Sequence, residues 1–378
     1  MALFANAASA SRKIKAKVIK ALDDMVAQEP SVHSPEGSLQ RSTRAVWYHG
    51  DGTISINDGA IMARSGPEAG ISGAKPGRDS AVITLRALWS GISRGTERLV
   101  FNGQVPVSEH RRMRCPHQEG DFPGPVKYGY CMVARCVDGP QNMLGRIGFC
   151  LHPHQAAFAV EPAMVHWLPD GLPARRGCLI ANMETALNII WDSHAKDGDS
   201  ILVVGGGVLG LLVTALAAQI AQTSVTLCDV NTERAGFAES VGARFCTPDA
   251  APSNQQVVIH TSANPAGLET ALNAAAFEAR VVEASWYGDK PVPVPLGGAF
   301  HSQRLQLISS QVGHIPAHKR AEWDYARRLA EAMALLCDDR FDALITDEIA
   351  FDDAPQAMPS VFANNAAGLM TVLRYPTD

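Results

Sequence analysis

The chain of 378 residues is long enough for two domains, and its 46% hydrophobic content is sufficient for full-sized cores. Its formal net charge of −5 argues against a nucleic-acid-binding protein, because such proteins normally carry a basic face. The eight cysteines include no C-x-x-C pair and no Cys/His cluster with zinc-finger spacing, so we expect free thiols in a reducing cytoplasm.

Residues 1–42 are predicted to be an extension of the globular protein. Its first 22 residues are basic and rich in Ser and Ala but lack the apolar stretch of a secretory signal, which leaves a transit peptide as one interpretation. The alternative, which we favour, is an appended helix that docks a partner. Residues 27–42 have the composition of a linker. The apolar face of that helix would hold Ile14, Val18, Leu22 and Met25.

A β-rich region follows the extension. Short strands are predicted at 81–89, 130–137 and 145–152, separated by turns rich in Gly and Pro.

The uncharged stretch from 200 to 228 could be a membrane span, a buried helix or a cofactor-binding turn. A span needs about 20 apolar residues in one helix, whereas three consecutive glycines interrupt this run after four apolar residues. The better interpretation is a strand at 201–204, a tight turn, a helix from 208 to about 222 and a strand at 224–230. We therefore predict a β-α-β unit of a parallel sheet, and no membrane partner.

The turn carries the spacing Gly205-x-Gly207-x-x-Gly210, which is typical of dinucleotide binding. The first glycine permits the turn, the second lets a pyrophosphate approach the backbone, and the third lets helix and strand pack closely. Amides at the start of the helix, including those of Val208 and Leu209, favour the phosphate charge.

Asp229 stands at the end of the second strand, 19 residues after Gly210. A carboxylate there accepts hydrogen bonds from ribose hydroxyls and repels a 2′-phosphate, so NAD(H) is predicted as the preferred cofactor. Arg234 weakens that preference and keeps NADP(H) open.

Further strands alternate with helices after this unit. They are predicted at 256–264, 279–288 and 305–313, with helices at 266–277 and 317–336 and a last strand at 368–375. Thr261 and Ser262, at the end of the first of these strands, are candidate cofactor contacts.

A β-rich region, a Rossmann unit and a C-terminal return together resemble the medium-chain dehydrogenase/reductase superfamily. The segments that carry this resemblance are "SGISRGTE" (90–97), "PVKYGYCMVARC" (125–136), "VHWLPDGLP" (165–173) and "ANMETALN" (181–188). With "LHPHQ" and "FHSQRLQLISSQVG", the chain is similar to the bacteriochlorophyllide-dehydrogenase-like branch.

The resemblance implies an α/β fold with two domains and a homodimer or homotetramer. The catalytic GroES-like domain would comprise residues 43–170 and 316–378, and the Rossmann doubly wound parallel sheet would comprise residues 171–315. The partner would be a small-molecule substrate, and Thr185 would lie beside the nicotinamide.

Zinc members of this superfamily hold their metal with a Cys, a His and a further Cys or acidic group. Here Ser93 or Arg94 stands at the first position, Tyr130 replaces the histidine, and the third region offers Cys178 and Glu184 in uncertain register. Because Ser and Arg are not competent zinc ligands and Tyr rarely is one, we expect no zinc. His152 and His154 flank a proline, and we interpret them as structural.

Without a metal, hydrogen bonds or a proton donor must polarise the reacting oxygen. Tyr130 and His301 are candidate donors, although one could be a packed aromatic and the other a structural histidine. Ser93 and Thr96 could extend a proton relay.

Candidate substrate contacts are spread over three segments. They are Glu184, which could instead form an ion pair, Arg304, which could instead bind a cofactor phosphate, and Arg94. A basic loop with Arg111, Arg112 and Arg114 could capture carboxylates or simply be solvated.

The leading hypothesis is a zinc-independent, NAD(H)-dependent oxidoreductase that interconverts a secondary alcohol and a ketone. The branch resemblance suggests a hydroxyethyl group on a ring system as substrate. Two alternatives stay open: an NAD(P)H-dependent enone or quinone reductase, and a non-catalytic dinucleotide-binding sensor or structural subunit.

Overall fold

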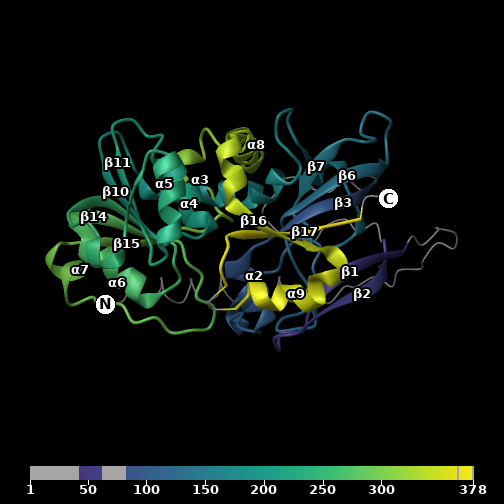
Figure 1. The fold of residues 1–378 in the computed structure, drawn as a ribbon, viewed down its shortest axis with the longest axis horizontal. Helices are drawn as coiled ribbons and strands as arrows, with labels where there is room; N and C mark the ends of the chain where they lie inside the picture. Colours follow the sequence, from purple (N-terminus) through teal and green to yellow (C-terminus); the bar gives the residue numbers. More distant parts are fainter. Residues whose placement is uncertain (1–41, 62–81, 364–365, 377–378) are drawn as a thin grey trace, which may run out of the picture. The chain divides into compact units, whose positions relative to one another are not determined.

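The computed structural model describes residues 42–61, 82–363 and 366–376 (Figure 1). By its contacts the chain divides into a unit ending at Gln40 and a unit beginning at Arg41, and every described residue belongs to the second. The helix predicted within residues 1–42 lies outside the described residues. Within them, no helix is long and apolar enough to cross a membrane.

A six-stranded parallel sheet forms the Rossmann part, with the strand order β12-β11-β10-β13-β14-β15 (Figure 1). The strands are β10 (Ser200–Val204), β11 (Ser224–Cys228), β12 (Arg244–Cys246), β13 (Gln255–His260), β14 (Ala275–Glu283) and β15 (Gln306–Ser309). Its helices include α3 (Ile180–Ser193), α4 (Val208–Ala217), α5 (Ala235–Ser240), α6 (Pro265–Ala274) and α7 (Ala299–Ser302). The predicted β-α-β unit is confirmed by β10, α4 and β11.

Strand β10 is apolar from Ile201 to Val204 because both of its faces are buried there. Ile201 and Val203 belong to the core cluster that contains α3 and α4 residues, whereas Leu202 and Val204 belong to the cluster that contains residues of α6. Helices therefore cover both faces of the sheet, as expected for parallel strands.

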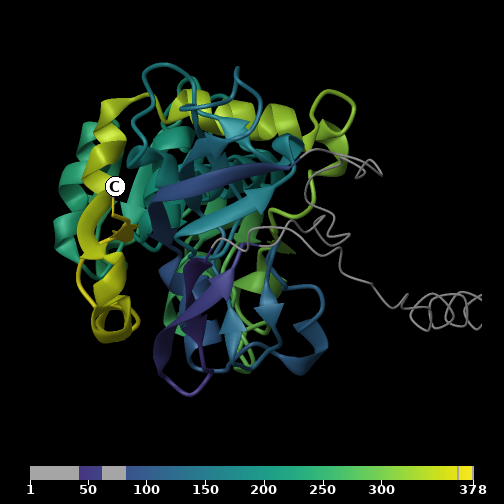
Figure 2. The same cartoon turned by 90° about the vertical axis from the view of Figure 1, so that its right-hand side faces the viewer.

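Two further sheets contain the β-rich part. The larger has the order β16-β17-β3-β6-β7-β9 with β8 paired to β3, and the smaller has the order β2-β1-β5-β4. Figure 2 shows β1 and β2 in purple, side by side at the edge of the smaller sheet. The strands are β1 (Ser42–Tyr48), β2 (Ile54–Ala60), β3 (Ile83–Ile92), β4 (Glu119–Gly120), β5 (Val126–Lys127), β6 (Met132–Asp138), β7 (Ile147–Cys150), β8 (Ala157–Val160), β9 (His166–Trp167), β16 (Ile345–Ala350) and β17 (Met370–Arg374).

The end of the chain returns to this β-rich part. β17 pairs antiparallel with β3, with Thr371 opposite Ile92, and parallel with β16. Helices α2 (Arg94–Phe101), α8 (Tyr325–Leu335) and α9 (Ala354–Val361) are the remaining regular helices of the described residues. Short 3₁₀ helices lie at Val107–Glu109, Pro162–Met164, Arg176–Leu179, Thr232–Arg234, Pro248–Ala250, Ala317–Lys319, Asp339–Leu344 and Phe351–Asp353.

Three predicted helices are shorter than expected. The helix predicted at 266–277 ends at Ala274, because β14 begins at Ala275. α4 ends at Ala217, and the chain turns at Gln222, whose φ of 59° no helix continues. The helix predicted at 317–336 begins only at Tyr325, because the side chain of Asp324 accepts the amide of Arg327 at 2.8 Å and caps the helix there.

A buried ion pair joins α3 to α8. The guanidinium of Arg328, which is fully buried, donates to Glu184 Oε1 at 3.0 Å and to Asn188 Oδ1 at 2.5 Å. It also donates to the carbonyl oxygen of Val312 at 2.7 Å. Three segments far apart in sequence are held together by one side chain.

His152 is buried within the β-rich part. Its ring stacks on Phe158 with the ring centres 3.8 Å apart, and its Nδ1 lies 3.0 Å from the Pro153 carbonyl oxygen. Burial holds the pKa of His152 well below its ordinary value, and the nearby His117 and Lys127 lower it further.

This buried histidine predicts a loss of stability in acid. Because His152 is neutral in the folded protein and titrates near 6.5 when unfolded, its contribution is complete above that pH and is lost below it, by about 1.4 kcal/mol per pH unit. Urea unfolding at pH 7, 6 and 5 should show a shallower fall for His152→Phe than for the wild type. Parallel curves for the two proteins would show that His152 does not couple to folding.

Candidate cofactor and active site

The glycine turn between β10 and α4 leaves no room for side chains on one side. A Cβ on Gly210 would lie 1.8 Å from the Gly205 carbonyl oxygen, and Gly205 itself has a φ of 111°. Gly207, in contrast, has nothing within 4 Å of its hypothetical Cβ, so its outer side is open. The backbone is thus closed against the sheet and open toward a ligand, and it suits a pyrophosphate.

The start of α4 adds donors to this turn. Gly207 is the residue before the helix, and Val208 and Leu209 are its first two residues, both partly exposed. Amides in the first turn of a helix have no acceptor within the helix, and the helix dipole favours an anion there.

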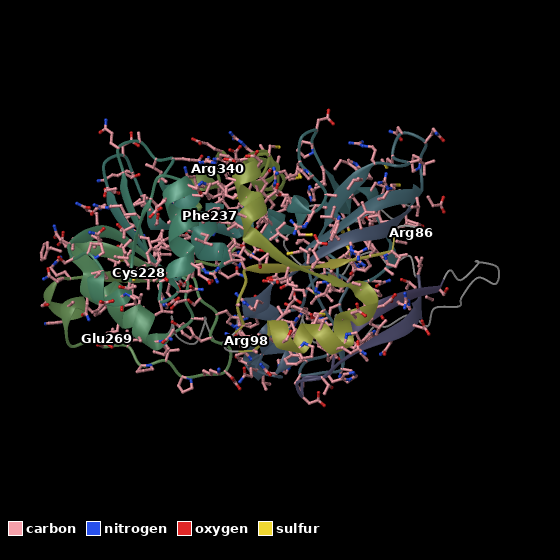
Figure 3. The ribbon with its side chains drawn as sticks, viewed as in Figure 1. Arg86, Arg98, Cys228, Phe237, Glu269 and Arg340 are labelled. Carbon is pink, nitrogen blue, oxygen red and sulfur yellow. The ribbon has the colours of Figure 1, made fainter. Side chains whose placement is uncertain are left out.

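Asp229 holds the turn from the neighbouring strand. Its Oδ2 accepts the amide of Gly206 at 2.5 Å, and its Oδ1 accepts the amide of Asn231 at 2.7 Å. Cys228, the residue before it, ends β11 and is labelled in Figure 3. A carboxylate has about four acceptor positions, so two remain for ribose hydroxyls.

Two arginines from different helices meet beside the turn, Arg94 at the start of α2 and Arg234 at the end of the 3₁₀ helix Thr232–Arg234. A Cβ on Gly206 would lie 2.9 Å from Cγ of Arg234, whose guanidinium donates to the Gly368 carbonyl oxygen at 3.1 Å. Arg94 donates to the same oxygen at 3.1 Å. Burial lowers the pKa of Arg94, and the charges of Arg234 and Arg98 lower it further; Arg98 is labelled in Figure 3. The structure therefore places Arg94 beside Arg234, a predicted cofactor residue, and a role of Arg94 in substrate binding stays a prediction.

Thr261 and Ser262 also reach the turn. The Thr261 hydroxyl donates to the Gly205 carbonyl oxygen at 2.9 Å, and the hypothetical Cβ of Gly205 would lie 2.7 Å from the Ser262 nitrogen. Thr185, another predicted cofactor residue, bonds within its own helix instead of to the turn. Its hydroxyl donates to the Ala181 carbonyl oxygen of α3 at 2.8 Å.

Tyr130 and Ser93 form a hydroxyl pair. The phenol donates to Ser93 Oγ, and Thr96 supplies a second hydrogen bond to the phenol. Tyr130 is partly exposed, yet burial of the phenol raises its pKa well above the ordinary value, the nearby Cys131 raises it further, and the hydrogen bonds to Ser93 and Thr96 oppose the shift. The phenol therefore stays protonated in neutral solution and can donate.

A buried carboxylate fixes the backbone of this pair. Glu97, which is fully buried, accepts the Ser93 amide at 2.7 Å and the Tyr48 hydroxyl at 2.5 Å. The ring of His154 lies between Glu97, at 3.0 Å, and Ser90, at 2.7 Å. Both ring nitrogens of His154 are thus engaged in this network, as the structural interpretation predicted.

The residues at the predicted metal positions do not fit zinc. Ser93 and Tyr130 bond to each other, and burial, the largest cause, raises the pKa of the Cys131 and Cys178 thiols, so both stay protonated. Glu184 is engaged with Arg328. Within the described ranges, no three His, Cys, Asp or Glu side chains are grouped so that they could hold a metal ion.

His301 and Arg304 lie at the opposite edge of the parallel sheet. The Arg304 guanidinium pairs with Glu278 at 2.8 Å, and the Glu278 amide donates to the Gln303 carbonyl oxygen. Glu278 lies just before Arg280, the residue from which β14 pairs in register with β13 and β15, and so at the amino end of these strands. The glycine turn follows the opposite, carboxyl end of β10. The structure does not bring His301 or Arg304 together with Tyr130.

The basic loop is solvated and paired. Arg112 bonds to Glu109 at 2.7 Å and Arg114 bonds to Asp121, and the side chains of Arg112, Arg114 and Asp121 are all at least one-third exposed. Sequence reasoning missed His260, which bonds to Ser262, and also Glu283 and Tyr287, which bond to each other beside the far side of the His260 ring. The only sequence signal was a polar residue at the end of each of two neighbouring apolar strands.

Comparison with known proteins gives relatives of low identity. No protein-family model matches the chain. It is 25% identical over 186 residues to 2-dehydro-3-deoxy-L-galactonate 5-dehydrogenase of Pseudoalteromonas atlantica, which covers 46% of this chain and 52% of that protein. It is 23% identical over 250 residues to D-xylulose reductase A of Aspergillus niger, covering 63% and 69%. The alignment thus spans only about half the length of the first relative.

Solved structures match over nearly the whole chain. A dehydrogenase of Sinorhizobium meliloti, described as zinc-binding and bound to NADP, has a TM-score of 0.66 at 18% identity and covers 89% of this chain and 100% of that one. An alcohol dehydrogenase of Escherichia coli complexed with NADH has a TM-score of 0.65 at 14% identity, covering 88% and 99%. The chain therefore has the fold of the medium-chain dehydrogenases and reductases, a GroES-like domain with a Rossmann domain.

Proposed function

We propose that the chain is an NAD(H)-dependent oxidoreductase that interconverts a secondary alcohol and a ketone without zinc. The observation that carries this proposal is the hydrogen bond between Tyr130 and Ser93, because both stand where the resemblance places metal ligands. The relatives support the reaction class, since their names describe a dehydrogenase and a reductase acting on sugar-derived substrates. A hydroxyethyl group on a ring system, a homo-oligomer and a cytoplasmic location rest on the sequence alone.

The chain offers a complete set of contacts for a dinucleotide. The amides of Val208 and Leu209 would face the pyrophosphate, Arg94 and Arg234 would neutralise its charge, and Asp229 would accept the ribose hydroxyls. When bound, the nicotinamide gives or accepts the hydride. The protein then has to orient the substrate and move one proton.

Tyr130 would supply that proton at its phenolic oxygen. A phenol with a raised pKa is still a stronger acid than an aliphatic alcohol, whose pKa is close to that of water. In ketone reduction the phenol gives its proton to the oxygen that gains charge, and the hydroxyls of Ser93 and Thr96 then donate to the phenolate that is left. Alcohol oxidation is the reverse, in which the phenolate of Tyr130 takes the proton of the alcohol.

Asp229→Asn should weaken NADH binding about tenfold and narrow the preference over NADPH, because a charge-assisted hydrogen bond is lost and the repulsion of a 2′-phosphate disappears. Asn keeps an acceptor for one of the two backbone amides that Asp229 binds. Fluorescence titration with each cofactor measures the effect, and Glu233→Gln, an exposed neighbour, is the control. An unchanged ratio would mean that the acid does not contact the ribose.

Tyr130→Phe should lower turnover about a hundredfold while leaving NADH affinity nearly unchanged, since a general acid contributes a factor of this order. The matched control is Tyr128→Phe, because the Tyr128 hydroxyl bonds the Met113 carbonyl oxygen instead of Ser93. Equal turnover of wild type and Tyr130→Phe would remove Tyr130 from the mechanism.

The proposed function as a whole is tested by a panel of secondary alcohols, enones and quinones with both cofactors, with metal content measured in parallel. We expect turnover of secondary alcohols with NAD, substoichiometric zinc and no effect of a chelator. Stoichiometric zinc that is required for activity would overturn zinc independence. Turnover of enones with NADPH alone, or NADH binding with no turnover, would favour the alternative enzyme or the sensor.

A further inference from the structure

A second cluster of polar side chains lies at the carboxyl edge of the Rossmann sheet, and the redox proposal does not use it. His260 ends β13 and Glu283 ends the neighbouring strand β14, where the two residues are paired in register. His260 Nδ1 lies 2.7 Å from Glu283 Oε2, and His260 Nε2 lies 2.6 Å from Ser262 Oγ. Because Ser262 is exposed and His260 is fully buried, the chain of hydrogen bonds runs from solvent to a carboxylate.

Further contacts fix the carboxylate and therefore the ring. Glu283 Oε1 accepts the Ser285 amide at 2.7 Å, and Oε2 accepts the Tyr287 hydroxyl at 3.1 Å. A carboxylate at Nδ1 keeps the proton on that nitrogen and leaves Nε2 to accept from the serine hydroxyl. This is the order of nucleophile, base and orienting acid that activates serine for acyl transfer, and it is recognised by geometry rather than by fold.

Helix α6 approaches the serine hydroxyl closely. A Cβ on Gly267 would lie 2.4 Å from Ser262 Oγ and 2.8 Å from His260 Nε2, so the backbone of the first helical turn comes near because Gly267 has no side chain. The amide of Leu268 is bonded to the Asn264 carbonyl oxygen, whereas amides earlier in a helix have no acceptor within it. The Gly267 amide, which lies in this first turn close to Ser262, is therefore the candidate donor to an attacked carbonyl oxygen as that oxygen gains charge.

We propose that Ser262 is an activated nucleophile and that this edge of the sheet hydrolyses small, activated carboxylic esters. Ser262 Oγ attacks the ester carbonyl carbon while its proton passes to His260 Nε2, and the alcohol leaves with that proton. Water then attacks the acyl-serine, His260 takes the proton of the water and returns it to Ser262 Oγ, and the carboxylic acid is released. The sum is ester and water converted into acid and alcohol.

We expect this ester hydrolysis in the protein that has no dinucleotide bound. The Ser262 nitrogen lies 2.7 Å from the hypothetical Cβ of Gly205, so the serine adjoins the glycine turn. On the basis of the proposed function, NADH bound at that turn covers Ser262 and inhibits the hydrolysis. The two proposals fail separately, because NADH binding is measured by fluorescence and serine reactivity is measured in its absence.

The test uses the cofactor-free, full-length protein with a fluorophosphonate probe and with p-nitrophenyl acetate. We expect one phosphonylated peptide, containing Ser262, and steady release of p-nitrophenol. Ser262→Ala should abolish both, and His260→Asn should slow both about a hundredfold. Ser240→Ala is the matched control, since Ser240 is an exposed serine whose hydroxyl bonds the Phe237 carbonyl oxygen, and it should react as the wild type does.

Glu283 acts through the ring and is a positioning residue, so its test is a pH profile. Glu283→Gln keeps a hydrogen-bonding group but removes the charge that stabilises protonated His260, and we expect the acid limb of the labelling rate to move to lower pH with a reduced plateau. A label on another serine, equal labelling of Ser262→Ala, or a rate unaffected by His260→Asn would overturn the proposal. With any of these results, the hydrogen bonds of the cluster would serve only to hold the loops after β13 and β14 in place. If His260→Asn does not fold, the exposed Ser262→Ala variant decides.

Discussion

The candidate site depends on one close approach, that of Gly210 to the carbonyl oxygen of Gly205. A Cβ on Gly210 would overlap that oxygen at 1.8 Å, so any side chain would push α4 away from the end of β10. With α4 held there, its first amides, the carboxylate of Asp229 and the hydroxyl of Thr261 surround one turn of backbone. The affinity of this edge for an anionic ligand follows from the packing of a helix against a strand.

Much of this edge could be predicted from the sequence because its determinants are local. Strands buried on both faces leave a continuous apolar run, and a turn without side-chain space leaves a glycine spacing, so β10 and β11 were found nearly to the residue. Helix ends were found less well. α4 stops at Ala217 because the hydroxyl of Thr223 bonds the carbonyl oxygens of Ala217 and Ile220. The spacing of apolar residues in the sequence does not predict these hydrogen bonds.

What the sequence could not reveal is which distant side chains meet. Glu184 was a candidate for a substrate contact or an ion pair, and the sequence did not show that its partner is Arg328, 144 residues later in the chain. Arg304 stands just before a strand of the Rossmann sheet, and nearness in sequence suggested nearness to the cofactor. A parallel sheet has two edges, however, and residues that precede a strand gather at the amino edge, away from the glycine turn. His260 and Glu283 are the converse case, since both end strands and so become neighbours.

The chemistry of the hydroxyl pair follows from the same burial that disfavours a metal there. Burial raises the pKa of Tyr130 and of Cys131, and the carboxylate of Glu97 raises both further. A zinc ligand must give up its proton, whereas a donor to a developing alkoxide must keep it until the reaction. Glu97 itself is tolerated in the interior because an amide, a phenol and an imidazole are bonded to it, and removing any one would leave part of a buried charge unsatisfied. The network that positions Ser93 therefore also keeps Tyr130 protonated, as a donor to a developing alkoxide must be until the reaction.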